Sequence, residues 1–350
     1  MNKKIKSNEV LAIEIGLITA LFPGIANTLI LNTSKNASLL SVLIAILIGT
    51  IPLFMIIKIS KNIKTESLKE YIIKKLGILG KILNIILITI AIFILFINSW
   101  LIIDFIISQF LTRTSYYFIA ILFFTIIAYI VNKGIETTSR TVFVLFILIS
   151  IIMIALWICL IPYINLSNLK PYIDVTTNKI IKSSIINTVY ITMPLIYILD
   201  LKHITTDKEN FEKTIVIGYI TSYLIIAIFL FFLLSIYGIE LSTILTYPVY
   251  ALFKKIQILG FIERIENFAG IQIITVFFVQ ASYLIYYIKR NLIKNKNQKK
   301  LTYLIALVIP ITSIFIFKNY NLTIVLKTSV YIIGSIITII TFLSIPQKNI

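Results

Sequence analysis

The sequence is poor in charged residues, cysteine and histidine, and each shortage excludes a class of protein. Only 13% of its 350 residues are Asp, Glu, Lys or Arg, while 59% are hydrophobic. A compact soluble domain leaves much of its surface in water and cannot hide so much apolar area. The single cysteine, Cys159, cannot form an intrachain disulfide. The single histidine, His203, lies among charged residues, and we expect it to be solvated.

Sequence motifs of enzymes are also missing. The chain contains no His-x-x-x-His pair, no cysteine cluster, no glycine-rich phosphate loop and no nucleophile elbow. Hydrolysis or metal catalysis within a membrane needs such a group of residues. We therefore predict a protein that is not an enzyme and has no catalytic residue, metal or cofactor. A membrane enzyme such as a lipid-linked glycosyltransferase would require Glu14 and Asp104 to be essential for turnover of a lipid substrate.

Long apolar runs are what the chain has in excess. They extend over 18 residues or more, about the length that a helix needs to cross a hydrocarbon core about 30 Å thick. The sequence predicts an all-α membrane protein with about ten transmembrane helices in a single polytopic domain, 1–350. Two segments are too polar to span: 61–81 is predicted to be an amphipathic cytoplasmic helix, and 242–260 a loop with a short helix. The predicted spans are 9–31, 38–58, 82–110, 115–132, 139–161, 183–200, 214–237, 262–288, 301–317 and 323–344.

The basic residues predict the orientation in the membrane. With an even number of spans, the segments on the side of the two termini hold 22 Lys and Arg, and those on the opposite side hold 8. Because cytoplasmic loops are enriched in Lys and Arg, we expect both termini to be cytoplasmic and the chain to lie in the inner membrane. The net charge of +18 then reflects topology and attraction to anionic headgroups. Membrane lipid, and not nucleic acid, is the predicted partner of these charges.

Two spans are interrupted near the middle of the membrane. The first contains Pro23-Gly24 and the sixth contains Pro194. Proline removes a backbone donor and clashes with the preceding turn, and an adjacent glycine lets the chain unwind. Such interruptions in the first helix of each half are typical of inverted-repeat transporters, although a simple proline kink is an alternative. We predict a five-plus-five inverted-repeat, LeuT-like fold, with repeats at about 9–161 and 183–344.

The two breaks predict a ligand site near the middle of the bilayer. Backbone groups freed there would hold the polar ends of a small molecule such as an amino acid, and aromatic side chains would cover the rest. Helical phase adds candidate side chains from the third, sixth and eighth spans. The predicted ligand-binding residues are Ala20, Leu21, Phe22, Pro23, Gly24, Asn98, Trp100, Tyr190, Thr192, Met193, Pro194, Tyr197, Gln272 and Thr275.

Acidic residues inside spans are costly, so two of them are candidates for proton coupling. Glu14 lies about one and a half turns into the first span, and Asp104 lies in the outer half of the third. The alternatives are a side chain that snorkels to the membrane surface for Glu14 and an interfacial hydrogen-bonding residue for Asp104. Asp200, at the cytoplasmic end of the sixth span, is predicted to be solvated.

Two charged groups are predicted to be structural or gating elements. Glu136 and Arg140 form an (i, i+4) pair at the start of the fifth span, with the acid first. Glu263, Arg264 and Glu266 open the eighth span, where one guanidinium can serve two carboxylates. Both groups are expected to fix helix ends and gate loops without touching the ligand.

Four segments, in order and at similar spacing, match those of one known family. The most specific runs from Tyr247-Pro248 through Leu252-Phe253 to Phe261-Ile262-Glu263-Arg264-Ile265-Glu266. The others are Ser67-Leu68-Lys69-Glu70-Tyr71, Gly134-Ile135-Glu136 with Ser139-Arg140, and Asn168-Leu169-Lys170-Pro171. On these residues the chain resembles the B subunit of the GerA-type spore germinant receptor, a branch of the amino-acid–polyamine–organocation transporters. The resemblance covers essentially the whole chain.

The resemblance implies the five-plus-five fold, a location in the inner membrane of the dormant spore, and recognition of a small nutrient such as an amino acid. It implies two partners, a germinant receptor A subunit and a C-subunit lipoprotein, and a role in triggering spore germination. The chain departs from the family pattern at Ile196 and Ile273, where relatives often have a carboxylate and a tryptophan, so the nutrient stays open. The alternative function is a proton-coupled amino-acid permease of the cytoplasmic membrane that uses Glu14 or Asp104.

Overall fold

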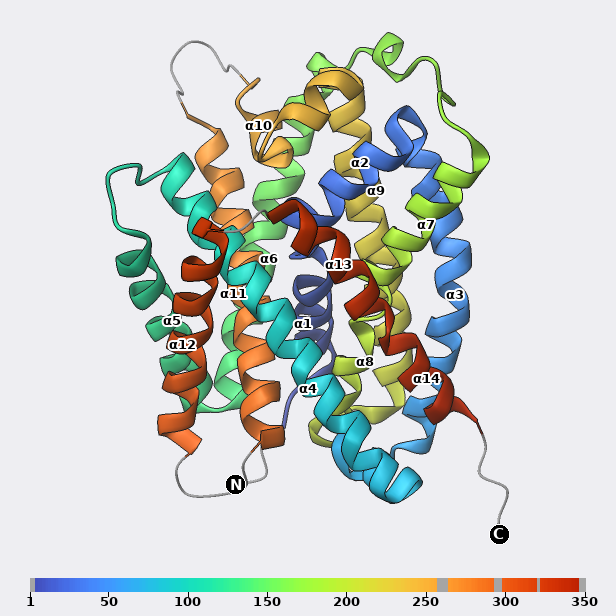
Figure 1. The fold of residues 1–350 in the computed structure, drawn as a ribbon, viewed down its shortest axis with the longest axis vertical. Coiled ribbons are helices and arrows are strands. Elements are labelled where there is room, and N and C mark those ends of the chain that lie inside the picture. The colour runs from blue at the N-terminus through green and yellow to red at the C-terminus, as the bar shows by residue number, and fades with distance from the viewer. Residues whose placement is uncertain (1–3, 257–263, 293–297, 320–321, 346–350) are drawn as a thin grey trace.

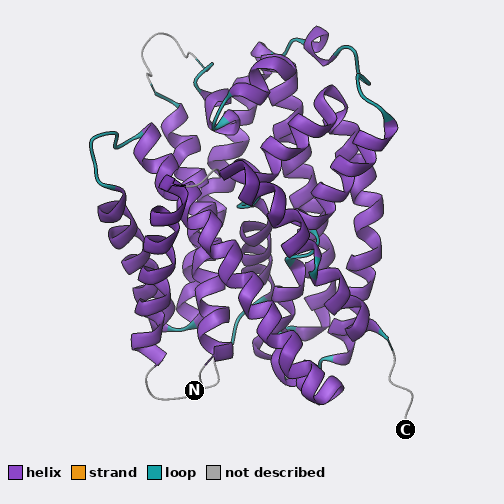
Figure 2. Cartoon of the chain, viewed as in Figure 1, coloured by secondary structure: helices purple, strands orange, loops and turns teal. Residues whose placement is uncertain are grey.

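The computed structural model describes residues 4–256, 264–292, 298–319 and 322–345. Throughout these ranges the chain forms helices joined by short loops (Figure 2). The extended pairing found in them is an isolated bridge between Ile5 and Thr205. Helices satisfy their backbone groups within one segment, as a membrane interior requires. The all-α class predicted from the sequence is confirmed.

The helices follow one another as shown in Figure 1. The first six are α1 (Ser7–Thr19), α2 (Asn27–Ser34), α3 (Ser38–Asn62), α4 (Leu68–Gln109), α5 (Tyr116–Lys133) and α6 (Ile135–Leu160). The next four are α7 (Thr177–Ile191), α8 (Leu195–Ile198), α9 (Phe211–Ile244) and α10 (Pro248–Phe253). The last four are α11 (Glu266–Leu292), α12 (Gln298–Asn319), α13 (Leu322–Gly334) and α14 (Ile336–Ser344).

Helices lie in each of the predicted spans, with a difference in the first. Nine helical segments of the described residues are long and apolar enough to cross a membrane. One of them, Asn27–Asn62, joins α2 to α3 through a short 3-10 turn. By contrast, α1 has only 13 residues because it stops at Thr19. The interruption of the first span therefore accounts for the difference between nine long segments and ten predicted spans.

The first break is a change of helix type. After α1 ends, Ala20 and Leu21 keep right-handed helical angles, and Phe22–Ala26 forms a π-helix. In this wider turn the Ala26 amide donates to the Leu21 carbonyl over 3.0 Å. Pro23 lies at its start, because a residue without an N–H group interrupts the regular ladder there. Single π-helical turns of this kind occur mostly inside longer helices and often at functional sites.

The second break is tighter. Pro194 has no N–H group, and the amides after it bond three residues back, as Leu195 does to Thr192 over 3.2 Å. The segment that contains this break, Thr177–Ile204, has 94% of its most apolar stretch buried, against 17% for the segment that contains α6. The sixth span therefore lies in the centre of the bundle, whereas α6 faces outward.

A glycine bends α4 near its start. Ser67 caps the helix, and its hydroxyl and backbone amide exchange hydrogen bonds with Glu70. Gly77 has a φ of 56°, in the left-handed region that glycine reaches without steric penalty. We call the segment before this glycine, 68–76, the arm. It is the amphipathic helix predicted over 61–81, and it is shorter than predicted.

The arm holds the ends of two distant helices. Lys69 donates to the carbonyl of Asn291, in the last turn of α11, over 2.6 Å. Lys75 donates to the carbonyl of Leu343, in the last turn of α14. Cations next to the last carbonyls of a helix satisfy free acceptors and match the helix dipole. The arm is therefore a structural support for the second half of the chain.

The central element of the bundle is α1, which packs against α6, α9 and α11 (Figure 1). Small residues allow the close approach: Gly16 of α1 lies against Val279 of α11, and Gly218 of α9 lies against Glu14. An added Cβ at either glycine would overlap its neighbour.

The start of α1 and the end of α14 lie on the same side of the bundle, which we call the terminal face (Figure 1). On this face the segment before α1 pairs with the segment after α8. The Ile5 amide donates to the Ile204 carbonyl over 3.1 Å, and the Thr206 amide donates to the Ile5 carbonyl over 2.9 Å. The first residues described are thus tied to the end of the sixth span.

Candidate functional site

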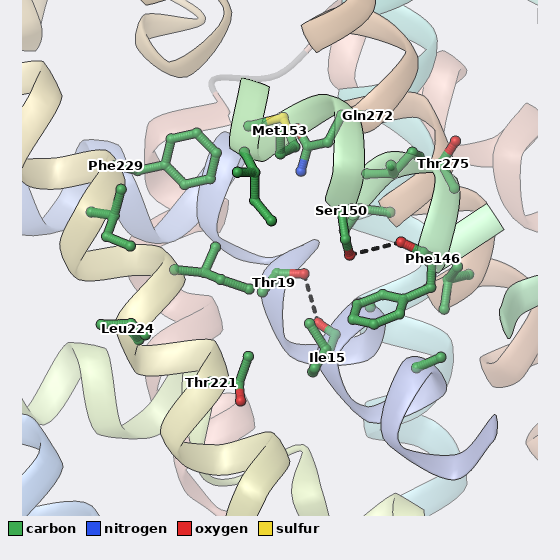
Figure 3. A pocket seen from close by; sticks show the side chains of 18 of the residues that line it. Ile15, Thr19, Phe146, Ser150, Met153, Thr221, Leu224, Phe229, Gln272 and Thr275 are labelled. Carbon is green, nitrogen blue, oxygen red and sulfur yellow. Dashed lines mark hydrogen bonds between the residues drawn. The ribbon is translucent and has the colours of Figure 1, made fainter. Parts of the chain in front are cut away.

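A cavity of about 240 Å³ lies along α1 and reaches to its end at Thr19 (Figure 3). It is bounded by α1, α6, α9 and α11. Small side chains of α1, at Ala12, Gly16 and Thr19, leave the space open. The rest of its wall is mostly apolar, and its larger members are Phe146, Ile149, Met153, Trp157, Leu224, Ile228 and Phe229. The cavity therefore favours a small molecule with an apolar part.

Few polar groups interrupt this wall. Gln272 of α11 is only 7% exposed, and its side-chain oxygen has no hydrogen-bond partner among the described residues. The hydroxyls of Thr19 and Ser150 are already bonded to the carbonyls of Ile15 and Phe146 in their own helices (Figure 3). A buried acceptor without a partner costs about 1–3 kcal/mol. Gln272 is therefore the acceptor that a bound ligand would satisfy.

Trp157 of α6 provides the complementary donor. Its ring packs edge-on against Phe229 of α9, with centroids 5.7 Å apart. Its indole N–H group is buried and has no hydrogen-bond partner among the described residues. Gln272 and Trp157 thus line a mostly apolar cavity, and each has a buried polar atom without a hydrogen-bond partner among the described residues.

The predicted ligand residues of the eighth span line this cavity, and those of the first span follow its edge at Thr19. Gln272 and Thr275 line it directly. Ala20, Leu21 and Phe22 continue α1 from the point where the lining ends, and all three are buried. The ring of Phe22 stacks on that of Phe229, which lines the cavity, with centroids 6.5 Å apart. The remaining residues of the first break, Pro23 and Gly24, lie in the π-helical turn.

The predicted residues around the second break lie in the core and do not line this cavity. The Tyr190 hydroxyl shares a hydrogen bond of 2.6 Å with Ser329 of α13. Thr192 lies 3.4 Å from the hydroxyl of Tyr223, and Met193 is buried beside it. These side chains join the break to neighbouring helices.

The turn after Pro194 is held in the same way. The Tyr197 hydroxyl donates to the Leu87 carbonyl of α4 over 3.0 Å, and Tyr283 of α11 donates to the Tyr197 carbonyl. The second break is therefore fixed between α4 and α11, and its residues are not among those that line the cavity.

The two predicted residues of the third span differ in their surroundings. Asn98 donates to the side chain of Gln280, which donates in turn to the Leu17 carbonyl of α1 over 2.8 Å. This chain links α4 to α1 through α11. Trp100 instead stacks on Tyr116, with centroids 5.5 Å apart, on the side of α4 that faces α5. The structure thus brings Asn98 toward α1 and places Trp100 away from it.

Sequence reasoning missed the contributions of the fifth and seventh spans. Met153, Trp157 and Phe229 line the cavity, but an aromatic or methionine in an apolar span carries no signal that separates a pocket from lipid. Asn27 had a visible signal, since it is a polar residue that follows the first break. It is fully buried, and neither polar atom of its amide has a hydrogen-bond partner among the described residues.

Glu14 is fully buried between α1 and α9. Both oxygens of its carboxyl group lack a hydrogen-bond partner among the described residues. The group lies against the backbone of Gly218, so the side chain does not snorkel to the surface. An anion in such a place is costly unless a proton or a cation compensates it.

Asp104 holds three segments together. It accepts hydrogen bonds from Tyr116, at the start of α5, over 3.1 Å and from Tyr247, just before α10. Burial, and then the carboxylate of Asp104, raise the pKa of Tyr247, so this hydroxyl stays protonated and continues to donate. The contacts fit the interfacial hydrogen-bonding alternative for Asp104.

The prediction that Asp200 is solvated is wrong. Its carboxylate is fully buried, and it accepts hydrogen bonds from Arg290 of α11 over 3.3 Å and from the Leu68 amide over 3.2 Å. The same guanidinium contacts His203, which is half-buried. The ion pair keeps a buried charge compensated, and the partner lies too far along the sequence to be recognised from it.

The predicted gating residues lie at helix starts. Glu136 and Arg140 form the expected ion pair over 2.6 Å at the start of α6, with both side chains exposed to solvent. Arg264 has a left-handed φ of 67°, and Glu266 begins α11. Glu263 lies outside the described residues, so its part in a network with Arg264 and Glu266 stays a prediction.

The model of one protein family, described as spore germination protein, matches residues 12–321. This chain belongs to the spore germination protein family. The matched range includes both helix breaks and all the residues that line the cavity. The family resemblance seen in the sequence is confirmed, and no curated protein matches the chain in sequence.

Among solved structures, this spore germination protein is similar to a Na+-coupled sialic acid symporter in a substrate-bound, outward-open state. The TM-score is 0.66 at 13% sequence identity, and the alignment covers 97% of this chain and 78% of the symporter chain. At this identity the likeness shows the fold alone. The predicted LeuT-like transporter fold is confirmed, and the division into repeats at 9–161 and 183–344 stays a prediction.

Proposed function

We propose that this spore germination protein is the B subunit of a germinant receptor, which recognises a small nutrient, such as an amino acid, in a transporter-like site and triggers germination without catalysing a reaction. The family and the permease-like fold support this function. One observation carries the position of the site: a cavity beside the first break is lined by Gln272 and Trp157, whose side chains hold an acceptor and a donor that are unpartnered among the described residues. An A subunit and a C-subunit lipoprotein in the spore inner membrane are the proposed partners.

An amino acid with an apolar side chain suits this chemistry. Its ammonium group donates to Gln272, its carboxylate accepts from Trp157, and its side chain lies against Met153 and Phe229. The cavity of about 240 Å³ accommodates a small ligand only.

Ligand binding shifts the population of conformations in this proposal. A molecule in the cavity contacts α1, α6, α9 and α11 together, so it stabilises the arrangement in which these helices are close. The size of this shift in population is set by the difference between the ligand's affinity for that arrangement and its affinity for the others. The partner subunits then respond to the changed position of these helices.

The test replaces Gln272 by Leu, which keeps the volume but removes the acceptor. We expect the nutrient concentration for half-maximal germination to rise about tenfold, since one buried hydrogen bond is lost. Thr275→Val, which removes a hydroxyl at the cavity, should act in the same direction. Thr89→Val is the matched control, because this exposed hydroxyl of α4 bonds only its own helix. An unchanged response to Gln272→Leu at normal protein level in the spore membrane would refute the site.

A second function, a proton-coupled amino-acid permease, is favoured by one observation. Glu14 is a buried carboxyl group, without a partner among the described residues, on the helix that lines the cavity, so its proton exchange would be tied to movement of α1. Uptake of labelled amino acid into proteoliposomes under a pH gradient tests this function. Uptake that depends on the gradient and is lost in Glu14→Gln supports the permease. Absence of uptake, with germination intact, rejects it.

A further inference from the structure

A second cavity, of about 440 Å³, lies between α2, α7 and α13. It is on the half of the bundle away from the terminal face, since α7 and α13 begin there (Figure 1). Its wall includes two basic residues, Lys182 of α7 and Lys327 of α13. This cavity shares no lining residue with the one beside α1.

The two lysines make this cavity electropositive. Both are exposed, and among the described residues neither forms an ion pair with a carboxylate. They come from different helices, so the sequence alone does not bring them together. Asn178, one turn before Lys182, adds an amide to the same wall. Two cations and an amide converging on one cavity within a membrane protein suit an anionic group.

Next to the lysines the wall is apolar and open to the surroundings of the bundle. Ile181 and Ile185 of α7 are exposed, and Tyr331 of α13 is 78% exposed. These residues lie on helices that cross the membrane, so the open side of the cavity faces lipid chains. Ile185 and Tyr331 lie about one turn deeper than the two lysines, so the cavity offers a charged end and an apolar side, as a phospholipid does.

We propose that this cavity binds an anionic phospholipid from the leaflet opposite the terminal face. The phosphate lies between Lys182 and Lys327, and an acyl chain lies along Ile185 and Tyr331. This proposal does not depend on the nutrient site.

The position of the cavity gives the lipid a structural effect. The outer parts of the two broken spans are α2 and α7, and the lipid contacts both. The third wall, α13, is already joined to α7 by the hydrogen bond between Tyr190 and Ser329. A lipid that bridges the three helices stabilises their present arrangement, so it raises the temperature at which the protein unfolds.

The test compares the full chain in detergent with added phosphatidylglycerol or phosphatidylcholine of the same acyl chains. Phosphatidylglycerol should raise the unfolding temperature more, and native mass spectrometry should show it bound. Replacing both lysines, Lys182→Ala with Lys327→Ala, should remove most of this difference. Each lysine near a headgroup contributes roughly fivefold to affinity, so the double variant should bind roughly thirtyfold more weakly.

The matched control is Lys170→Ala with Lys179→Ala, which removes the same charge from the same side but not from the cavity. The control should behave as the unmodified protein. The proposal is overturned if both phospholipids act equally, if the lysine pair at the cavity can be removed without effect, or if the control loses the effect to the same extent. It is also overturned if inorganic phosphate alone reproduces the full stabilisation, because the acyl chain then contributes nothing.

Discussion

At the scale of residues, two fully buried carboxyl groups, Asp200 and Glu14, have different surroundings. Asp200 is buried with a guanidinium and a backbone amide around it. Glu14 is buried with neither among the described residues. An uncompensated charge in the interior costs far more than a paired one. Asp200 therefore belongs to a structural ion pair, whereas Glu14 has no compensating group among the described residues.

The pair of Asp200 and Arg290 predicts unequal effects of removing its two members. Arg290→Met leaves the fully buried carboxylate without its cation and should destabilise the protein by about 3–5 kcal/mol. Asp200→Asn should cost only about 1 kcal/mol, because Asn still accepts from Leu68 and the partly exposed Arg290 can reach water. Thermal unfolding of the purified protein measures both. The double variant should be more stable than Arg290→Met alone, and equal losses from the two single changes would contradict this interpretation.

The residue scale is also where sequence reasoning reached least far. Glu14 and Asp104 could be singled out because a carboxyl group in an apolar run is visible. The residues that bond to the acids, Tyr247 for Asp104 and Arg290 for Asp200, could not be predicted, since they come from segments distant in sequence. Gln272 was selected by helical phase and does line the cavity, whereas Trp100 was selected in the same way and packs on Tyr116. Helical periodicity shows which residues share a face of a helix, but it does not show which other helix packs against that face.

At the scale of elements, the breaks in the first and sixth spans could be located from sequence because proline acts on its own backbone. The form of each break could not. One became a π-helical turn and the other a turn bonded three residues back. Near the second break, α3 packs closely on α7 and α9, and this close approach requires small residues.

Gly49 of α3 is such a residue, and it predicts a large effect for a small substitution. A Cβ there would lie 2.6 Å from the Tyr219 hydroxyl and 2.8 Å from the Thr192 hydroxyl. Gly49→Ala should therefore destabilise the protein by about 1–3 kcal/mol. Gly334→Ala is the control, because its nearest contact is an ordinary 3.5 Å from Val189 and alanine favours a helix by about 1 kcal/mol. Unfolding temperatures should move in opposite directions, and a fall of equal size in both would show that the contact at Gly49 is unimportant.

At the scale of the whole molecule, ion pairs are distributed unevenly between the terminal face and the opposite face. The ion pairs found between described residues all lie on the terminal face, at the arm, the start of α6 and the end of the sixth span. The same face is rich in Lys and Arg, a pattern that predicts a cytoplasmic side. The fold class and the helical segments could be predicted from hydropathy, because a membrane imposes length and apolarity on each span.

The orientation can be tested with single cysteines. In a Cys159→Ser background, Ser167→Cys lies in the exposed loop after α6, and Glu209→Cys lies in the exposed loop before α9 on the terminal face. A membrane-impermeant maleimide added to intact cells should label the first at once. It should label the second only after the membrane is opened. The reverse pattern would place the termini outside and overturn the charge-based prediction.

The bend at Gly77 offers a position from which conformational changes of this protein can be measured by fluorescence. Because the arm carries both Lys69 and Lys75, its displacement by one helical turn would break its hydrogen bonds to α11 and α14 together. A fluorophore on its exposed Lys74 would then report on two spans at once, although it is attached to neither.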